Sequence, residues 1–235
     1  MANFQLRKEE NDKISVKCAI IEGKENFMAK VAVFLAPGFE EIEALTVVDY
    51  LRRANVNVTT VSVPEDGNPD SEEKVTGSHQ ITVIADITLK EFIEEKKEAE
   101  MDALYLPGGM PGASNLAANQ YLFQLITKMD RKGIIVAAMC ASPAVVLART
   151  GILSSRKWTC YPGMNNNLAE YCGSEDWASE VMENSTHIEN VPYVFDNNVL
   201  TGRGPGTAEE FAMKLVELLT DANTAKAIHD GSCQR

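Results

Sequence analysis

The run from residue 133 to residue 146, GIIVAAMCASPAVV, limits the possible folds of this chain more than any other stretch. Its apolar, β-branched first half predicts a fully buried strand. Its second half predicts the start of a helix, with Pro143 suited to the first turn. Cys140 falls at the junction, and the small residues Ala138 and Ser142 stand two positions away on either side. The run therefore predicts a sharp strand-to-helix turn with a cysteine at its apex.

Two interpretations of Cys140 follow from this position. Hydrolases of the G-x-S-x-G type place a serine at such a turn, called the nucleophile elbow, and here a cysteine replaces it. Unpaired N–H groups and the positive end of a helix dipole would favour the thiolate, so we expect a lowered pKa for this thiol. The alternative is a structural cysteine that ends a core strand, because cysteine is among the most frequently buried residue types.

Strands and helices alternate along the rest of the chain. Apolar runs predict strands at 31–35, 56–63, 81–84, 102–106, 158–161 and 198–201, in addition to the run before Cys140. Amphipathic runs predict helices at 40–54, 89–99, 120–132, 142–151 and 208–219. This order predicts an α/β fold, a single-domain, flavodoxin-like parallel sheet sandwiched between helices, without an internal repeat or a second domain.

The helix expected at 40–54 carries apolar and acidic side chains. Its apolar stripe is expected to face the sheet and consists of Ile42, Leu45, Val48 and Leu51, at spacings of three. Glu40 and Glu41 are expected to be solvated carboxylates, which the helix dipole favours in a first turn. Glu43 stands beside the apolar stripe and is the better candidate for a partly buried acid.

A glycine-rich turn, PGGMPG at 107–112, follows one of the predicted strands. Such a turn lets backbone N–H groups approach an anion or oxyanion closely, although a plain strand exit is the commoner explanation. It is not a P-loop, because no Gly-Lys-Ser/Thr follows. Ligand sites of parallel sheets lie at the carboxyl ends of the strands. We therefore expect one site to gather Glu43, Gly108, Gly109, Cys140 and the Gly204-Pro205 turn.

Composition narrows the class of protein. The formal charge of −12, from 22 basic and 34 acidic residues, argues against nucleic acid or an anionic membrane as the main partner. No run reaches the roughly 18 to 20 apolar residues of a membrane span. The five cysteines are widely spaced and form no C-x-x-C pair, which indicates neither a metal site nor a disulfide framework. The charged start of the chain is unlike a signal peptide, so we expect a cytoplasmic protein.

The two ends of the chain fit the alternating pattern poorly. Residues 1–27 are expected to be an N-terminal extension of unknown role, and Met28 is an alternative natural start. We expect the α/β domain to cover 28–222 and residues 223–235 to form a C-terminal tail.

Several motifs in order make the chain resemble the ThiJ/PfpI superfamily, within it the branch of the parkinsonism-associated deglycase and the YajL-type proteins. They are GFEEIEALTVVDYLRRA at 38–54, LPGGMPGASNL at 106–116, AAMCASPAVVLA at 137–148, TCYP at 159–162 and GRGPGTAEEFA at 202–212. Together they span about residues 30–219, nearly all of the chain outside its ends.

The resemblance implies roles for the residues at the strand ends. Cys140 corresponds to the family's reactive cysteine, and Glu43 to the acid that is hydrogen-bonded to its sulfur. A carboxyl group close to a thiolate is pushed to stay protonated, so it donates a hydrogen bond to the sulfur. The resemblance also implies that the N–H groups of Gly109 and Ala141, beside Gly108, form an oxyanion hole.

Other positions match the surroundings of the family's pocket. Arg53 and the Gly204-Pro205 turn match positions that lie near the pocket across a twofold axis, and we expect such a homodimer. Animal members have a histidine at the position of Tyr161, whereas YajL-like proteins have a tyrosine there, as this chain does. His79 corresponds to an arginine near the family's pocket. Cys160, next to Tyr161, is expected to be a buried structural thiol, with a place near the pocket or a dimer seam as the alternative.

The resemblance implies an enzyme without cofactor or metal that processes reactive carbonyls. The expected substrates are small 2-oxoaldehydes, with glutathione-independent, glyoxalase III-like conversion of methylglyoxal to lactate, or glycated protein side chains. The alternative is a redox-sensing stress protein or chaperone in which Cys140 is oxidised. An amidase or protease ranks third, because no histidine is placed to protonate the leaving amine.

Overall fold

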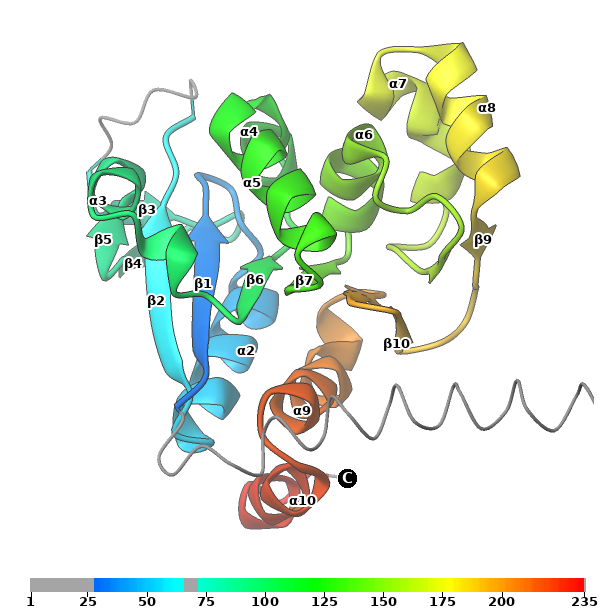
Figure 1. Ribbon diagram of the computed structural model, residues 1–235. Coiled ribbons are helices and arrows are strands. Elements are labelled where there is room, and N and C mark those ends of the chain that lie inside the picture. The colour runs from blue at the N-terminus through cyan, green and yellow to red at the C-terminus, as the bar shows by residue number, and fades with distance from the viewer. Residues whose placement is uncertain (1–27, 66–71, 235) are drawn as a thin grey trace, which may run out of the picture.

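A seven-stranded sheet forms the centre of the computed structural model, which describes residues 28–65 and 72–234 (Figure 1). The strand order is β10-β11-β7-β6-β1-β2-β5. The strands are β1 (Lys30–Leu35), β2 (Asn57–Ser62), β5 (Ile87–Thr88), β6 (Ala103–Leu106), β7 (Ile135–Met139), β10 (Tyr193–Asp196) and β11 (Val199–Gly202). All neighbours pair in parallel except β10, which runs antiparallel to β11 at one edge. The predicted single α/β domain is confirmed, with this edge strand as the departure from a purely parallel sheet.

Helices cover both faces of the sheet because side chains along each strand alternate between them. In β1, Val31, Val33 and Leu35 pack toward helices α2 (Glu41–Arg53) and α9 (Ala208–Leu219). Ala32 and Phe34 pack toward the opposite layer. This second layer contains α3 (Leu89–Glu94), α5 (Gln120–Arg131), a π-helical turn (Pro143–Leu147) that continues into α6 (Ala148–Thr150), α7 (Leu168–Cys172) and α8 (Glu175–Asn184). Both faces of the central strands are therefore buried, as their continuous apolar runs predict.

The apolar stripe predicted for α2 is wrong in its first half. Ile42 and Leu45 are 57% and 39% exposed, whereas Val48 and Leu51 are buried. Residues three apart turn by about 300° around an α-helix, so a stripe with only this spacing drifts by half a turn over nine residues. The face that packs on the sheet and on α9 instead consists of Glu43, Ala44, Val47, Val48 and Leu51.

Several elements differ from the sequence prediction. The helix expected at 89–99 breaks after α3, because Lys96 adopts a left-handed φ of 53° before a short turn at Lys97–Ala99. Helix α4 (Gly112–Ala118) and strand β10 were not predicted. The hairpin of β3 (Lys74–Thr76) and β4 (Thr82–Ile84) and the parallel pair of β8 (Lys157–Trp158) and β9 (Thr186–His187) lie outside the main sheet. These small units contribute side chains to the two sites described below.

The last described part of the chain is helical. Residues expected to form the tail belong to α10 (Ala222–Gly231), which packs against α9 and buries Ala225 (Figure 1). Asp221 caps this helix through the backbone N–H groups of Asn223 and Thr224. The expected extension at 1–27 and residues 66–71 lie outside the described residues.

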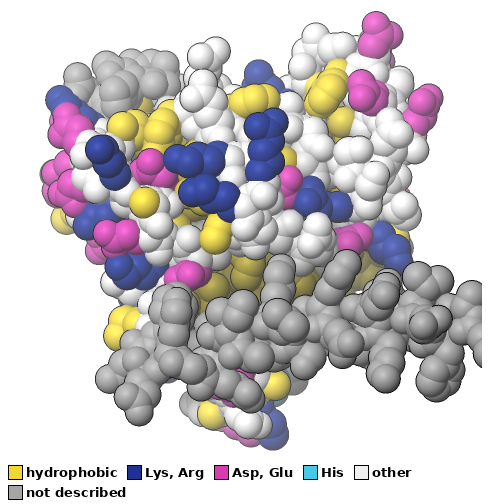
Figure 2. Space-filling model, viewed as in Figure 1, with side chains coloured by type: hydrophobic (Ala, Val, Ile, Leu, Met, Phe, Trp, Pro, Cys, Tyr) yellow, Lys and Arg dark blue, Asp and Glu magenta, His cyan; other side chains and the backbone are white. Residues whose placement is uncertain are grey.

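The outer surface carries charges of both signs. On the face seen in Figure 2, basic side chains gather over the region of α5, with acidic side chains around them. In the last turns of α5 and just after it, Lys128, Arg131 and Lys132 line a shallow surface hollow together with the half-exposed Phe123. Among the described helices, none combines the length and the apolar composition that a membrane span requires.

Candidate active site

Cys140 lies directly after β7, before the π-helical turn at Pro143–Leu147. Its backbone adopts φ 60°, a left-handed conformation that costs a non-glycine residue about 1 kcal/mol or more. Two hydrogen bonds hold this conformation: the Cys140 N–H donates to the Gly202 carbonyl at 2.9 Å, and the Cys140 carbonyl accepts from the Tyr161 N–H at 2.8 Å. The side chain is 8% exposed. The sheet thus fixes the cysteine while a small part of it stays accessible.

The turn after β6 approaches Cys140 so closely that it has to contain glycine. A Cβ atom at Gly108 would lie 2.6 Å from the Cys140 Cβ and 2.7 Å from Glu43 Oε2, both too short for real contacts. Gly109 has φ 90°, and a Cβ there would lie 2.4 Å from the Glu40 nitrogen. The buried Ser142 hydroxyl donates to the Pro107 carbonyl at 2.6 Å and ties this turn to the helix start after Cys140.

Glu43 is the buried acid of the site. Its side chain is fully buried, more so than predicted, and Oε2 accepts a hydrogen bond from the Gly108 N–H at 2.8 Å. Oε1 makes no hydrogen bond of standard geometry with any described group, although the nearby Cys140 thiol influences the pKa of this carboxyl. Burial raises the pKa of Glu43 to about 7, against the lowering effects of Cys140 and of the Gly108 N–H. The carboxyl therefore changes its protonation state near neutral pH.

The predicted lowering of the Cys140 pKa is wrong. Burial raises the pKa of this thiol, and the charge and hydrogen bonding of Glu43 act in the same direction. The N–H groups of Gly109 and Ala141 donate to the sulfur and act in the opposite direction, but they do not outweigh the loss of hydration. The prediction considered only the N–H groups and the dipole at the helix start. It did not include the burial of the sulfur, which has the larger effect on the pKa.

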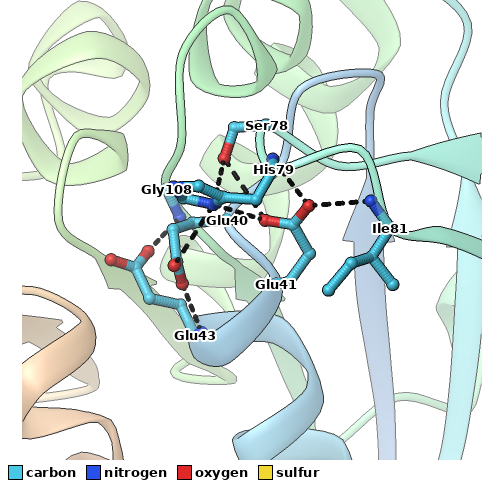
Figure 3. A network of polar contacts seen from close by, with 7 residues as sticks. All are labelled: Glu40, Glu41, Glu43, Ser78, His79, Ile81 and Gly108. Carbon is cyan, nitrogen blue, oxygen red and sulfur yellow. Dashed lines mark hydrogen bonds and ion pairs between the residues drawn. The ribbon is translucent and has the colours of Figure 1, made fainter.

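Glu40 and Glu41 are buried, contrary to the expected solvated carboxylates. Glu40 Oε2 caps the helix by accepting from the Glu43 N–H at 2.7 Å. Glu41 accepts hydrogen bonds from the backbone N–H groups of His79 at 2.7 Å and Ile81 at 3.3 Å, within the turn that joins β3 to β4 (Figure 3). The burial of Glu41 comes from this hairpin, which lies almost forty residues away in the sequence.

His79 contacts the acids of α2 rather than the sulfur of Cys140. Its Nδ1 lies 2.9 Å from Glu41 Oε2 and 3.9 Å from Glu40 Oε1, and these contacts raise the pKa of the imidazole (Figure 3). Ligand atoms of these three residues lie within 4.8 Å of one another, the spacing of a metal site. The Glu41 oxygens are already engaged by the hairpin, so the group functions as an ion pair that fixes the start of α2.

The other expected pocket residues divide into two groups. Tyr161 and Gly204 are neighbours, because a Cβ at Gly204 would lie 3.4 Å from the Tyr161 ring, and Pro205 begins the short turn that follows. The half-exposed Tyr161 is joined to the Cys140 carbonyl, so this pair borders the site. Arg53 is ten residues beyond Glu43 on α2, about 15 Å along the helix axis, and forms an ion pair with Asp49. Within one chain it does not reach the sulfur.

Two positioning residues were not predicted from the sequence. The Tyr105 hydroxyl donates to the Glu43 carbonyl at 3.0 Å from a fully buried position in β6. Ser142 holds the glycine turn, as described above. A polar residue inside an otherwise apolar strand, as in DALYL, is the signal that could have identified Tyr105, because a buried hydroxyl needs a partner.

Comparison with known proteins identifies the family. Residues 29–218 match the DJ-1/PfpI family. The chain belongs to the DJ-1/PfpI family. The predicted resemblance is thereby confirmed.

Individual members of the DJ-1/PfpI family are similar over most of this chain. Protein dj-1beta of Drosophila melanogaster is 32% identical over 205 residues, which cover 87% of this chain and 97% of that protein. The glutathione-independent glyoxalase DJR-1.2 of Caenorhabditis elegans is 32% identical over 192 residues, covering 81% of this chain and 89% of that protein. The solved structure of oxidized DJ-1 from Toxoplasma gondii superposes with a TM-score of 0.71 at 31% identity, over 87% of this chain and 98% of that one.

Proposed function

We propose that this protein converts 2-oxoaldehydes such as methylglyoxal to 2-hydroxy acids, without glutathione or any other cofactor, through Cys140 and Glu43. The observation that carries the proposal is the fully buried Glu43 carboxyl, with a pKa raised to about 7, beside a cysteine whose sulfur receives two backbone N–H groups. A nucleophile, a proton carrier and donors for an oxyanion are the three parts that such a reaction needs. The similarity to a glutathione-independent glyoxalase supports the same reaction class.

In the first step the Glu43 carboxylate takes the thiol proton of Cys140 while the sulfur forms a bond to the aldehyde carbon. The C=O electron pair moves to the oxygen, where the N–H groups of Gly109 and Ala141 stabilise the negative charge. The proton then passes from Glu43 to this oxygen, which leaves a neutral hemithioacetal and a carboxylate. Because the ground-state thiol keeps its proton, the adjacent carboxylate has to act as the base, and a pKa near 7 suits that role.

In the second step Glu43 removes the proton on the former aldehyde carbon, which leaves a planar enediolate. The hydroxyl proton on that carbon passes to the neighbouring oxygen, and Glu43 returns the first proton to the neighbouring carbon. This transfer converts the hemithioacetal into a thioester of the 2-hydroxy acid. Water then adds to the thioester carbonyl, releases the acid and restores the Cys140 thiol. The sum is one methylglyoxal plus one water giving one lactic acid, so no external oxidant or reductant is consumed. The same steps on early glycation adducts of protein side chains would amount to deglycation.

The protein is further proposed to act as a cytoplasmic homodimer. Ile42 and Leu45 form an exposed apolar area on α2, and Arg53 lies on the same helix. A second copy would cover this area and bring Arg53 to the partner's site. The free thiols of Cys140, Cys160, Cys172 and Cys233 support a reducing compartment. Sedimentation of the full chain tests the dimer, and a wild-type mass of one chain would contradict it.

The decisive experiment measures lactate formed from methylglyoxal in the absence of glutathione and metal. We expect turnover by the wild type and a loss on the order of a thousandfold or more in Cys140→Ser, because the nucleophile is removed. Cys160→Ser is the matched control, since it changes another buried cysteine outside the reacting pair, and should retain activity. Equal activity of the wild type and Cys140→Ser would refute the mechanism.

The same variants distinguish the enzyme from a redox sensor. If the wild type forms no lactate, while mild peroxide adds the mass of oxygen atoms to it and not to Cys140→Ser, the sensor is the better description. Cys140, which keeps 8% of its surface exposed, and the similarity to a DJ-1 whose structure is of an oxidized form favour this alternative as the second candidate.

A further inference from the structure

A second cysteine, Cys160, is paired with a histidine on the far side of the Cys140 backbone. Cys160 follows β8, and its side chain is 2% exposed. Its Sγ lies 3.6 Å from Nε2 of His187, the last residue of β9. Cys160 packs in the core layer of α5 to α8, whereas Cys140 belongs to the layer of α2 and α9. This pair takes no part in the chemistry proposed for Cys140.

Rigid elements hold both side chains in place. β8 and β9 pair in parallel with Trp158 opposite His187, and the Ile188 N–H donates to the Trp158 carbonyl at 2.8 Å. The Trp158 ring contacts the imidazole edge to face, with centroids 4.8 Å apart. The Thr159 N–H donates to the buried Thr201 hydroxyl at 2.9 Å. The sulfur and the nitrogen are therefore preorganised, which a binding site requires.

The distance between the two atoms is that of neighbouring ligands on one metal ion. Zinc lies about 2.3 Å from a cysteine sulfur and about 2.0 to 2.1 Å from an imidazole nitrogen, in tetrahedral geometry. These values place sulfur and nitrogen about 3.5 Å apart. The 3.6 Å between Cys160 Sγ and His187 Nε2 fits an ion between them without movement of the backbone.

The pair borders a cavity of the right size and polarity for an ion. The cavity has a volume of about 80 Å³, and its polar lining includes Cys160, His187, Glu189, Asn190 and Arg203. One water occupies about 30 Å³ of liquid, so the cavity admits an ion with roughly two waters but no drug-sized organic ligand. The negative charge of Glu189 acts on both Cys160 and His187. The Arg203 guanidinium donates a hydrogen bond to Asn190 Oδ1 at 3.2 Å.

The surroundings also suit a metal-bound thiolate. A backbone N–H of Asn165 donates to the Cys160 sulfur, and such a bond favours the charged form. The His187 ring is partly buried, and its Nε2 faces the Cys160 sulfur. The thiolate is the form that binds a metal, so the bound cation displaces the thiol proton of Cys160.

We propose that Cys160 and His187 bind one thiophilic divalent cation, of the class of Zn²⁺, with the Glu189 carboxylate turning in as third ligand and water completing the tetrahedron. The thiol proton is released to solvent when the sulfur–metal bond forms, and no electron is transferred. The Glu40, Glu41 and His79 group gathers more ligand atoms, but its carboxylates already hold backbone N–H groups. The Cys160 pair faces a cavity instead.

The test uses Co²⁺ as a spectroscopic probe and Zn²⁺ in calorimetry, on the full chain carrying Cys140→Ser so that the other buried thiol cannot bind. We expect one ion per chain and a sulfur-to-cobalt charge-transfer band. Adding Cys160→Ser should remove the band, and adding His187→Gln should weaken Zn²⁺ binding at least about tenfold. Adding Cys172→Ser is the matched control and should change neither readout.

Each contrary result overturns the site. These results are no binding by the Cys140→Ser chain, a charge-transfer band that persists after Cys160→Ser, or Zn²⁺ affinity that is unchanged by His187→Gln. Circular dichroism of each variant verifies that it is folded. A zinc-dependent rise in melting temperature of the Cys140→Ser chain, absent after Cys160→Ser, provides a measurement that does not depend on cobalt.

Discussion

Cys140 and Cys160 lie twenty residues apart in the sequence, and the hydrogen bond from the Tyr161 N–H to the Cys140 carbonyl places their backbones side by side. Both side chains are buried and both thiols have a raised pKa. They differ in what faces the sulfur. Cys140 faces a buried carboxyl and two backbone N–H groups, whereas Cys160 faces an imidazole and a small polar cavity.

The difference shows that burial of a thiol does not by itself define its chemistry. Near Cys140 the protein provides a base for the thiol proton and donors for a developing negative charge, which suits addition to a carbonyl group. Near Cys160 it provides lone pairs, which suit a cation. Four changes test whether the two environments are as distinct as this comparison states.

The largest expected effect is on lactate formation, when the side chain that faces each cysteine is replaced in turn. Glu43→Gln should lower lactate formation by about 10² to 10³-fold, because the proton carrier is lost while the shape is kept. His187→Gln, the equivalent change at the other cysteine, should stay within about twofold of the wild type. Steady-state kinetics with methylglyoxal gives both numbers, and comparable losses in the two variants would mean that the sites act as one.

The second effect is on stability as a function of pH. Glu43 has a pKa of about 7 in the folded chain against 4.5 as the unperturbed value, so the folded state binds more protons between these limits. The free energy of unfolding should therefore fall as pH rises from 4.5 to 7, by about 3 kcal/mol in total. Urea titrations across this range measure the fall, and Glu43→Gln should abolish it.

Glu41→Gln is the control for that measurement. The pKa of Glu41 is lowered in the folded chain, where burial acts upward but is outweighed by hydrogen bonds from His79 and Ile81. A lowered pKa gives stability that is present above the unperturbed value and lost as pH falls through the folded value. The fall in the free energy of unfolding between pH 4.5 and 7 should therefore remain in Glu41→Gln. If it disappears in this variant, Glu43 is not the acid that causes it.

A smaller effect is expected from one added methyl group. Gly108→Ala would place a carbon within 2.6 Å of the Cys140 Cβ, so the free energy of unfolding should drop by about 1 to 3 kcal/mol and Glu43 should be displaced. Gly206→Ala is the control, because nothing lies within 4 Å of its added carbon. Thermal melts of both variants suffice, and equal melting temperatures would show that the turn yields without cost.

The smallest effect concerns the metal-free Cys160 pair. Cys160→Ala removes the weak hydrogen bonds from its sulfur and should cost about 1 kcal/mol of unfolding free energy. Cys233→Ala, at an exposed cysteine, should change it by less than about 0.5 kcal/mol. A Cys160→Ala loss of several kcal/mol in urea would mean that this thiol supports the core far more than its contacts indicate.

The sequence was sufficient for features that depend on local periodicity. The apolar runs of β1 and β7, the amphipathic α9 and the position of Cys140 between strand and helix were all predicted. The orientation of α2 was not predicted correctly, because a stripe with a spacing of three drifts around the helix. The side of α2 that carries Glu43, Ala44 and Val47 packs on the sheet and on α9 instead. Identifying that side requires knowledge of a partner more than 150 residues away.

The electrostatic state of the site depends on such distant contacts. Glu41 is buried by a hairpin at 74–84, and the Cys140 pKa is decided by how the turn after β6 and Glu43 close over the sulfur. The Cys160 and His187 pair depends on the pairing of β8 with β9, two short strands whose match no repeat or periodicity indicates. Residue types were visible in the sequence, whereas their protonation and partners required the fold.

The two backbone hydrogen bonds that fix Cys140 have a stereochemical consequence. With the Cys140 N–H held by Gly202 and its carbonyl held by Tyr161, the backbone that carries the sulfur is fixed, and the N–H groups of Gly109 and Ala141 hold the sulfur itself. Glu43 lies on one side of that sulfur, fastened to the Gly108 N–H. A proton delivered from this one side to a planar intermediate reaches only one of its two faces. The hydroxy acid of the proposed reaction should therefore be a single mirror-image form.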